Sequence, residues 1–215
     1  MLKENRKTLI ITSLITLMPA VIGAILWDRL PDVMATHFGF NNEADGFTGK
    51  AFAVFGTPAL MLALLWICAF VTAHDPKRQN ISGKMFSFVL WIVPVVSLLL
   101  AVVIYPYNLG YKMDMMFIMG IVLGLMFVIL GNYLPKARRN YTIGIRVPWT
   151  LADEDNWNRT HRLAGFIWVI GGMAILTLNL IGAGNTSLMI GAAVAAMVLI
   201  PLVYSFVIYL KKEQN

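Results

Sequence analysis

Residues that could take part in binding or catalysis are concentrated in two polar stretches of an otherwise apolar chain. The first stretch, residues 28–50, holds four acidic residues, one histidine and three glycines. His37, Glu43 and Asp45 could recognise an external ligand through charge and hydrogen bonds, so we predict a ligand-binding surface there. The same three residues could instead hold a metal ion, although one histidine without a closely spaced partner is a weak metal motif. A loop that only rests at the membrane interface is the simplest alternative.

The local structure of this first stretch is predicted in three pieces. Residues 30–32, Leu-Pro-Asp, are typical of a turn or the start of a short helix. His37, followed by Phe38 and Phe40, favours a short extended piece at the membrane interface. Residues 42–46 are rich in turn-forming types.

The second polar stretch, residues 135–162, carries residue types that have specific uses. Gly144 permits a backbone turn that other residues avoid. Arg146 stands between an apolar Ile-Gly-Ile segment and a Val-Pro-Trp corner, where we expect it to pair with an acid or a backbone carbonyl. The candidate functional residues of this inner loop, as partner contacts, are Asn140, Gly144, Arg146, Pro148, Trp149, Glu154, Trp157 and His161.

A helix is predicted in the second half of this stretch. Thr150 is followed three residues later by Asp153, a pattern that starts helices. Trp157 and His161 are four residues apart and would share one face. We predict an amphipathic helix that lies along the inner membrane surface and runs into the next span.

Several of these residues also have a simpler interpretation. Arg138 and Arg139 are typical of lipid-headgroup anchors. Trp149 and Trp157 are typical of interfacial aromatic residues, and His161 could cap a helix or contact a headgroup.

Motifs of enzymes, metal proteins and nucleic-acid binders are missing from the sequence. It contains no HExxH, GxSxG or phosphate-binding glycine loop. The single cysteine, Cys68, excludes an intramolecular disulfide and a cysteine zinc cluster, and we interpret it as a small buried residue. The net charge is +6, but no basic helix with stacking aromatics accompanies it. We therefore expect no catalytic site, cofactor or metal and no direct binding of nucleic acid.

Apolar runs make up most of the remaining chain. Hydrophobic residues amount to 59% and charged residues to 13%, whereas soluble domains carry about 25% charged residues. Six runs of 19 to 23 residues lack charged side chains, and each can cross a bilayer as a helix. The first run is longer than a secretory signal core, so we expect it to be retained. The predicted spans are residues 9–27, 51–73, 85–105, 115–134, 163–181 and 188–210.

The distribution of positive charge orients these spans. Fourteen lysines and arginines lie in the two tails and in the second and fourth loops, against three, Arg29, Lys50 and Lys112, on the other side. The positive-inside rule places the richer side in the cytoplasm. The sequence therefore predicts an all-α, polytopic membrane helix bundle of six transmembrane helices, N-in and C-in.

Two regions are predicted along the chain. Residues 1–73 form an N-terminal membrane hairpin with the extracytoplasmic loop 28–50, and residues 74–215 form a four-helix membrane region with the cytoplasmic loop 135–162. Gly120 and Gly124 on the fourth span could let helices approach closely. The spans lack charged side chains, which argues against an ion-coupled transporter.

The motifs of both loops resemble those of a known family, the SdpI-type immunity proteins. The inner loop is similar to the cytoplasmic motif of that family, in the segments NYLPK, NYTIGIRVPWTL and WNRTHR. The outer loop resembles the domain that precedes this motif in the family, and the six-span layout is the same. The matching segments are residues 132–136, 140–151 and 157–162 of the inner loop, and residues 30–38, 45–46 and 50 of the outer loop.

The resemblance implies a bacterial plasma-membrane protein that protects its cell from a secreted antimicrobial peptide. In the best-known system of the family, the immunity protein is also a signal receptor that holds a small transcriptional autorepressor at the membrane. The expected partners are thus membrane lipids, the peptide and a cytoplasmic autorepressor, with the oligomeric state left open. One alternative is a transporter or exporter of a peptide or lipid-like molecule. A second is a membrane enzyme acting on a lipid headgroup through Arg146, Glu154 and His161.

Overall fold

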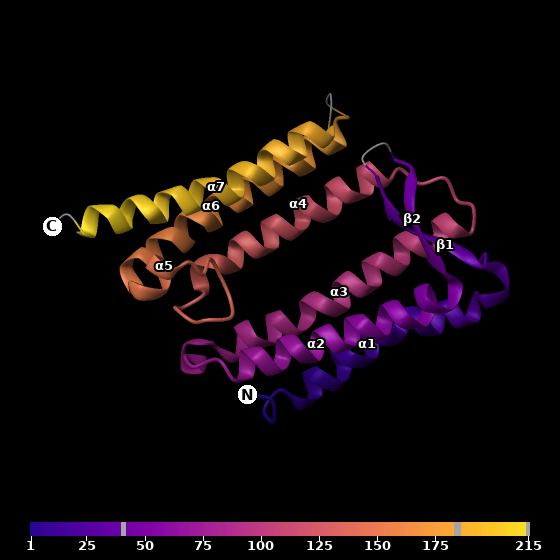
Figure 1. Cartoon of the computed structure of the whole chain (residues 1–215), viewed down its shortest axis with the longest axis horizontal. Helices are drawn as coiled ribbons and strands as arrows, with labels where there is room; N and C mark the ends of the chain where they lie inside the picture. The colour runs from indigo at the N-terminus through magenta and orange to yellow at the C-terminus, as the bar shows by residue number, and fades with distance from the viewer. Residues whose placement is uncertain (40–41, 183–185, 214–215) are drawn as a thin grey trace. The chain divides into compact units, whose positions relative to one another are not determined.

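The computed structural model describes residues 1–39, 42–182 and 186–213, and helices dominate it (Figure 1). Within these residues, six helices are long and apolar enough to cross a membrane. The predicted fold class and the predicted number of spans are therefore confirmed. The long helices are α1 (Arg6–Ile25), α2 (Thr57–Ala73), α3 (Gly83–Asn108), α4 (Met115–Tyr133), α6 (Glu154–Leu180) and α7 (Thr186–Glu213). The second span also includes the π-helical turn Phe52–Gly56, which leads directly into α2.

The start of α6 differs from the predicted start of the fifth span. The helix begins at Glu154 and continues without a break to Leu180, so the polar turns run into the apolar span, as predicted, and the two form one element. Its N-cap is Asp153, whose Oδ1 accepts a hydrogen bond from the Asp155 N–H at 3.0 Å. The prediction that Thr150 caps this helix is wrong, because Thr150 lies in the preceding short helix α5 (Pro148–Ala152).

The chain folds into two compact units. Unit 1 contains residues 1–74 and 82–115, and unit 2 contains residues 75–81 and 116–215. By packing, α3 therefore goes with α1 and α2, whereas the sequence-based division grouped the third span with the carboxy-terminal region. The segment 75–81, which connects α2 to α3, belongs to unit 2.

Unit 1 is held together by contacts between α1 and α3 as well as by apolar packing. The Tyr105 hydroxyl donates a hydrogen bond to the Pro19 carbonyl at 2.7 Å, and the Ser97 hydroxyl donates one to the Thr16 carbonyl at 2.9 Å. Gly23 lies between Tyr105 and Val54 of the π-helical turn Phe52–Gly56, and a Cβ there would come within 2.7 Å of both side chains. The buried cluster at this end comprises Leu30, Met34, Ala53, Val54, Ala101, Ile104 and Tyr105.

The outer loop of unit 1 contains a β-hairpin that the all-α prediction did not include. Strand β1 (Val33–Phe38) pairs antiparallel with strand β2 (Ala44–Gly49). The extended piece predicted around His37 and Phe38 is confirmed as β1, while Phe40 lies outside the described residues.

Two other predictions for this loop need correction. Residues 44–46, predicted as part of a turn cluster, are the first half of β2, because the turn is completed earlier, at Asn42 with φ +68°. Residues 30–32 do not start a helix. The 3₁₀ turn of this region comes before them, at Trp27–Arg29, and Leu30 is already extended.

Unit 2 packs α4, α6 and α7 through small residues and one apolar cluster. The Cβ positions of Gly124 and Gly131 on α4 would lie 3.0 and 2.9 Å from the carbonyl oxygens of Gly172 and Gly165 on α6. Such close approach of two backbones needs glycine, which supports the packing role predicted for Gly124. Gly120, the other glycine of the predicted pair, lies instead against the Asn179 side chain. Between α6 and α7, the Trp168 indole N–H donates to the Met197 carbonyl at 2.8 Å.

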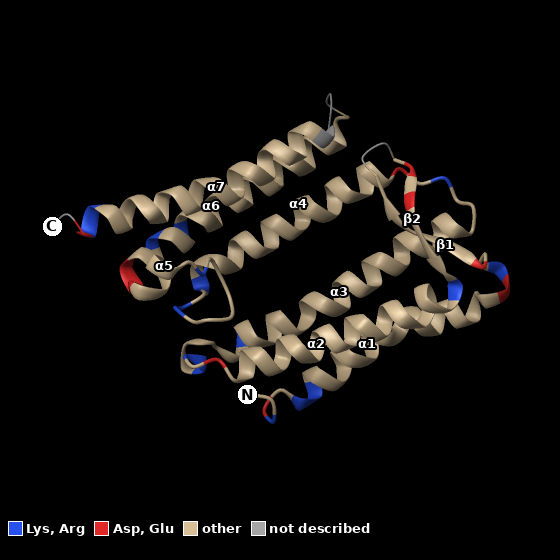
Figure 2. Cartoon of the chain, in the orientation of Figure 1, with Lys and Arg blue, Asp and Glu red and all other residues tan. Residues whose placement is uncertain are grey.

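Charged side chains lie at the ends of the helices and in the connections, and the long middle portions of the helices lack them (Figure 2). This arrangement is what a hydrocarbon environment requires, because an unpaired charge in lipid is costly. The side of the membrane on which each terminus lies stays a prediction.

Candidate functional site

The inner loop of unit 2 is built around a buried asparagine. Asn140 is 1% exposed. Its Oδ1 accepts hydrogen bonds from the backbone N–H groups of Thr142 and Ile143, and its amide donates to the carbonyls of Arg138 and Ile143. One side chain therefore satisfies four backbone groups of a turn, and we assign Asn140 to the framework of the loop rather than to its surface.

A second anchor comes from the connection between α2 and α3. Asp75 is 4% exposed. Its Oδ2 accepts from the Tyr141 N–H at 2.8 Å and from the Thr142 hydroxyl at 2.5 Å, and its Oδ1 accepts from the Lys77 N–H at 2.7 Å. These bonds fix the segment 75–81 to the inner loop, and the Asn80 amide adds a bond to the Arg139 carbonyl.

Sequence reasoning missed Asp75. The available signal was an Asp-Pro pair directly after an apolar span, a combination that favours turn initiation. The contact with Tyr141 and Thr142 spans more than sixty positions, and no local pattern predicts such a pairing.

Trp157 and His161 form the buried floor of the loop. Their rings stack with centroids 4.0 Å apart, and both residues are at most 1% exposed. The Trp157 indole N–H donates to the Ala137 carbonyl at 2.7 Å. The interfacial role considered for Trp157 and the headgroup contact considered for His161 are therefore both wrong, because neither side chain reaches the surface.

The hydrogen bonds of His161 define its chemical form. Nε2 accepts the Ile145 N–H at 2.9 Å, and Nδ1 faces the Trp157 carbonyl at 2.8 Å, so the proton must be on Nδ1 and the ring must be neutral. Both nitrogens are engaged, and no face of the ring is left for a substrate.

Gly144 lies directly above this histidine. Its φ is +115°, a backbone conformation that residues with a Cβ rarely adopt, and a Cβ at this position would fall on His161 Nε2. Gly144 was predicted from the sequence as a special turn position. Two features of the structure require glycine there: the positive φ of the backbone and the His161 ring next to it.

The two arginines of the loop end on backbone carbonyls. Arg146 is exposed, and its Nη1 donates a hydrogen bond to the Tyr141 carbonyl at 2.7 Å. Of the two partners predicted for Arg146, an acid or a backbone carbonyl, the structure thus shows the carbonyl. Arg139 donates through Nη1 to the carbonyls of Leu151 and Ala152 at the end of α5. The headgroup role considered for Arg139 therefore gives way to a helix-capping role.

The helix α5 connects the loop to α7. The Trp149 indole N–H donates to the Ser205 hydroxyl at 2.9 Å, and the Asn156 amide donates to the Ser205 carbonyl at 2.9 Å. The Trp149 ring lies 5.1 Å from Phe206, centroid to centroid, and 6.1 Å from Tyr209. Trp149 is half-buried, so its position is fixed while one part of it stays accessible.

A charged cluster ties the start of α6 to the end of α7. Lys212 Nζ lies 2.6 Å from Asp153 Oδ2 and 3.3 Å from Asp155 Oδ2. The hydrogen bond from Lys212 holds the pKa of the Asp153 carboxyl below its usual value. Glu154, between these two acids, is exposed.

The eight inner-loop candidates thus divide into two groups. Asn140, Gly144, Trp157 and His161 form the framework, and the accessible residues are Arg146, Pro148, Trp149 and Glu154. We refer to these last four as the inner surface group. Specific recognition needs accessible side chains that are held in place by a rigid framework, and the inner loop has both.

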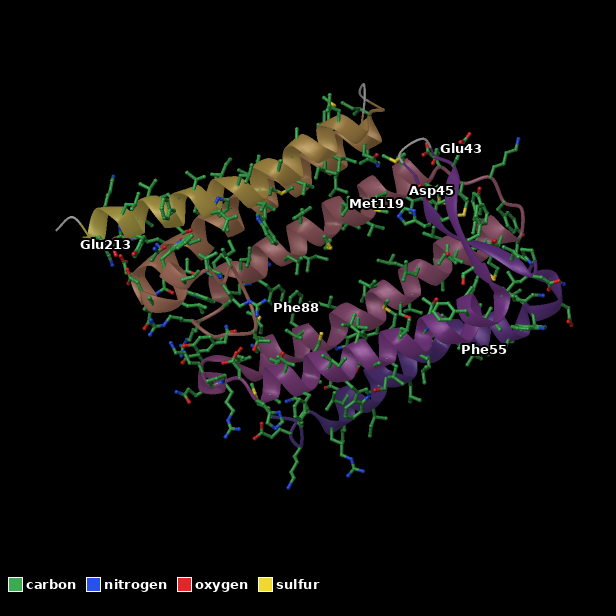
Figure 3. All side chains as sticks on the ribbon, viewed as in Figure 1. Glu43, Asp45, Phe55, Phe88, Met119 and Glu213 are labelled. Carbon is green, nitrogen blue, oxygen red and sulfur yellow. The ribbon has the colours of Figure 1, made fainter. Side chains whose placement is uncertain are left out.

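The outer candidates lie on the hairpin of unit 1. His37 Nδ1 and Asp45 Oδ1 are 2.5 Å apart, and both side chains are more than half exposed. Glu43 lies in the turn, where its carbonyl accepts the Gly39 N–H at 2.9 Å, and Figure 3 shows Glu43 and Asp45 at the same end of the hairpin. Among the residues described, no group of three His, Cys, Asp or Glu side chains is arranged to hold a metal ion.

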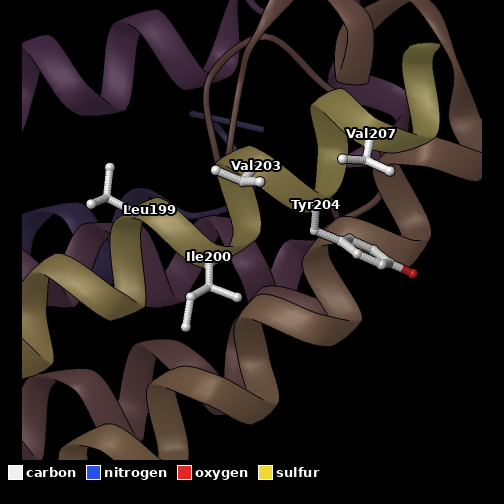
Figure 4. A pocket seen from close by; sticks show the side chains of 5 residues that line it. All are labelled: Leu199, Ile200, Val203, Tyr204 and Val207. Atoms are coloured by element: carbon white, nitrogen blue, oxygen red, sulfur yellow. The ribbon is translucent and has the colours of Figure 1, made fainter.

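An apolar depression of about 440 Å³ lies on α7 (Figure 4). It is lined by Leu199, Ile200, Val203, Tyr204 and Val207, all from one helix. Because a membrane-spanning helix presents such a face to acyl chains, the depression fits lipid and offers no polar site for a transported solute.

Comparison with known proteins supports the resemblance found in the sequence. Residues 136–205 match the SdpI/YfhL protein family, and residues 14–62 match a domain of unknown function, DUF1648. The immunity protein SdpI of Bacillus subtilis (strain 168) is 26% identical over 174 residues, which cover 79% of this chain and 80% of that protein. No solved structure matches significantly. The first match begins within the inner loop and ends in α7, so it includes the loop framework and its contacts with Ser205.

Proposed function

Because this chain carries an SdpI/YfhL-family region, we propose that it is a membrane immunity protein that protects a bacterial cell from a secreted antimicrobial peptide. It acts in the plasma membrane with both termini in the cytoplasm. The outer hairpin, with His37, Glu43 and Asp45, meets the peptide. The inner surface group then signals to a cytoplasmic partner, for which a small autorepressor is the candidate.

The observation that carries the proposal is the division within the inner loop. Three buried residues, Asn140, Trp157 and His161, satisfy one another and the backbone, and together with Gly144 they hold Arg146 and its neighbours at the surface. Such a loop is suited to present a fixed surface to a partner. The resemblance to a protein named as an immunity protein suggests that this partner belongs to an immunity response.

The same geometry supports a non-enzymatic role. The enzyme alternative needs His161 as an acid or base, but both its nitrogens are hydrogen-bonded inside the loop. A candidate acid–base group must reach the proton that it transfers. Glu154 and Arg146 remain accessible, but an arginine guanidinium keeps its proton in proteins and cannot replace His161 as the acid or base.

The test is survival of a sensitive bacterial strain that expresses the protein, challenged with a panel of secreted antimicrobial peptides. We expect protection by the unchanged chain and loss of protection in Arg146→Ala at equal membrane abundance. The matched control is Arg162→Ala, which removes another exposed cation, at the last position of the loop and outside the inner surface group, and should leave protection intact.

Two results would overturn the proposal. If the unchanged, correctly inserted protein protects against no peptide, the immunity function fails. If Arg146→Ala protects as well as the unchanged chain, the inner surface group is not the signalling surface, and peptide capture at the outer hairpin alone would have to explain immunity.

A further inference from the structure

The hairpin of unit 1 has one edge that is occupied and one that is open. On β1, the Ala35 N–H donates to Asn108 Oδ1 at 2.8 Å, and the Asn108 amide donates to the Ala35 carbonyl at 2.9 Å. The carboxamide of Asn108, at the end of α3, thus occupies this edge by the same two bonds that a neighbouring strand would make.

The pairing register determines where the equivalent groups of β2 point. Ala35 is directly opposite Phe47, and Val33 is directly opposite Gly49. Residues opposite each other in an antiparallel pair either bond each other or both face away. Because the polar groups of Ala35 face Asn108, those of Phe47 must face away from β1. Bonded and non-bonded residue pairs alternate along an antiparallel ladder. The Lys50 N–H donates to the Asp32 carbonyl at 2.9 Å, so these two residues are a bonded pair and the N–H of the preceding residue, Gly49, points outward as well.

This outer edge of β2 is accessible. Phe47 is 61% exposed and Gly49 is exposed. In the part of the chain that the structure describes, no hydrogen bond from outside the hairpin reaches the N–H or carbonyl of Phe47 or the N–H of Gly49. The Gly49 carbonyl is different, because it precedes the helical turn that begins at Lys50 and accepts its first bond. An unpaired row of strand N–H and carbonyl groups is a template for another strand.

The charge around the edge favours a cationic occupant. The stretch 28–50 carries four carboxylates against two cationic side chains. The pair of Lys50 with Asp32 at 3.0 Å takes up one charge of each sign, so the carboxylates remain in excess by two. Asp45 lies on β2 itself and Glu43 lies in the turn before it.

We propose that the outer edge of β2 binds an extended cationic peptide as a third strand of the hairpin sheet, through the N–H and carbonyl of Phe47 and the N–H of Gly49. This inference deepens the proposed function and rests on it, since it specifies how the outer hairpin meets its peptide. On the opposite edge, the Asn108 carboxamide already bonds both the N–H and the carbonyl of Ala35, as the backbone of an added strand would. Recognition is then mainly through the peptide backbone, with the Phe47 side chain adding apolar contact.

The sharpest test removes one outward donor. Gly49→Pro deletes an N–H that is not used within the hairpin, and proline is tolerated on edge strands at such positions. Gly49→Ala is the matched control, because it keeps the N–H and its Cβ would meet nothing within 4 Å.

The measurement is amide hydrogen exchange of the full chain in lipid nanodiscs, with a synthetic decapeptide of alternating lysine and valine as the probe. We expect the probe to slow exchange at the Phe47 and Gly49 amides at least tenfold. Gly49→Pro should lose the effect at Phe47, and Gly49→Ala should keep it. The Thr48 amide faces β1, so its slow exchange without peptide confirms that each variant retains the hairpin.

A second probe removes the same bonds from the peptide side. The decapeptide N-methylated at every residue keeps its charges but cannot donate backbone hydrogen bonds, so it should give no protection. Equal protection by both peptides, or equal binding to Gly49→Pro and Gly49→Ala, would show that charge alone attracts the probe and would overturn strand addition. Absence of protection by the unmodified probe at millimolar concentration overturns it as well.

The exchange experiment separates this inference from the proposed function. Protection of the Phe47 and Gly49 amides in a protein that gives cells no immunity would keep the strand site and discard the immunity role. Cell survival that is lost in Gly49→Pro and kept in Gly49→Ala would connect the two. Survival that is equal in both variants would show that immunity does not use this edge.

Discussion

Individual residues of the inner loop are constrained by what lies next to them in space. Trp157 has the type and position of an interfacial aromatic residue, yet it is fully buried because its indole N–H has a carbonyl partner at Ala137. Sequence patterns reveal which residue types are present, but whether an aromatic ring faces lipid or the loop interior depends on a partner twenty positions away. The special role of Gly144 was predictable because a positive φ is a local property of the backbone.

At Gly144, replacement by alanine should destabilise unit 2. The new Cβ would fall on His161 Nε2, and the backbone is held at φ +115°. Strain of this kind costs about 1–3 kcal/mol. We expect a lower midpoint of thermal unfolding in detergent and faster proteolysis of the inner loop.

The matched control for this change is Gly191→Ala on α7, where a Cβ would meet nothing within 4 Å. Alanine is the better helix former, so this variant should unfold at the same temperature or higher. An unchanged unfolding temperature in Gly144→Ala would contradict the close contact between Gly144 and His161.

At the scale of elements, the long helices were predictable and their connections were not. A run of about twenty apolar residues is itself the physical requirement for crossing a bilayer, so six spans could be predicted from composition and length. The hairpin could be predicted only in part, because the extended piece at His37 is local, whereas its pairing with residues 44–49 depends on register. The link between the segment 75–81 and the inner loop depends on Asp75, which a local pattern cannot connect to Tyr141.

Asp75→Asn should loosen the inner loop without unfolding the chain. An asparagine presents one acceptor oxygen where the carboxylate uses two, and its amino group would face a donor, either the Tyr141 N–H and Thr142 hydroxyl or the Lys77 N–H. A buried donor left without a partner costs about 1–3 kcal/mol. Hydrogen exchange at the Tyr141 amide should therefore become at least several-fold faster.

Asp32→Asn serves as the comparison for Asp75→Asn. The Asp32 side chain is 97% exposed and makes an ion pair with Lys50 at the surface. Exposed ion pairs contribute little, so exchange throughout the inner loop should stay as it is in the unchanged chain. If Asp75→Asn behaves like Asp32→Asn, Asp75 does not anchor the loop.

At the scale of the whole molecule, the proposed function requires that the two polar loops lie on opposite sides of the membrane. The β-hairpin follows α1 and the inner loop follows α4. Three spans therefore separate the two loops, and an odd number of crossings places them on opposite faces. The assignment of a cytoplasmic face to the inner loop rests on the excess of lysine and arginine in its neighbourhood.

Accessibility of single cysteines to a membrane-impermeant maleimide in intact cells tests this orientation. In a Cys68→Ala background, Tyr111→Cys lies between α3 and α4 and is 66% exposed in the unchanged chain, and Gln79→Cys lies in the exposed turn between α2 and α3. We expect Tyr111→Cys to react in intact cells and Gln79→Cys to react only after the membrane is permeabilised. The reverse pattern would place the hairpin in the cytoplasm, where a secreted peptide does not reach it, and peptide binding at β2 would lose its role in immunity. Reaction of both positions in intact cells would contradict the six-span topology itself, because these two connections are separated by a single crossing, α3.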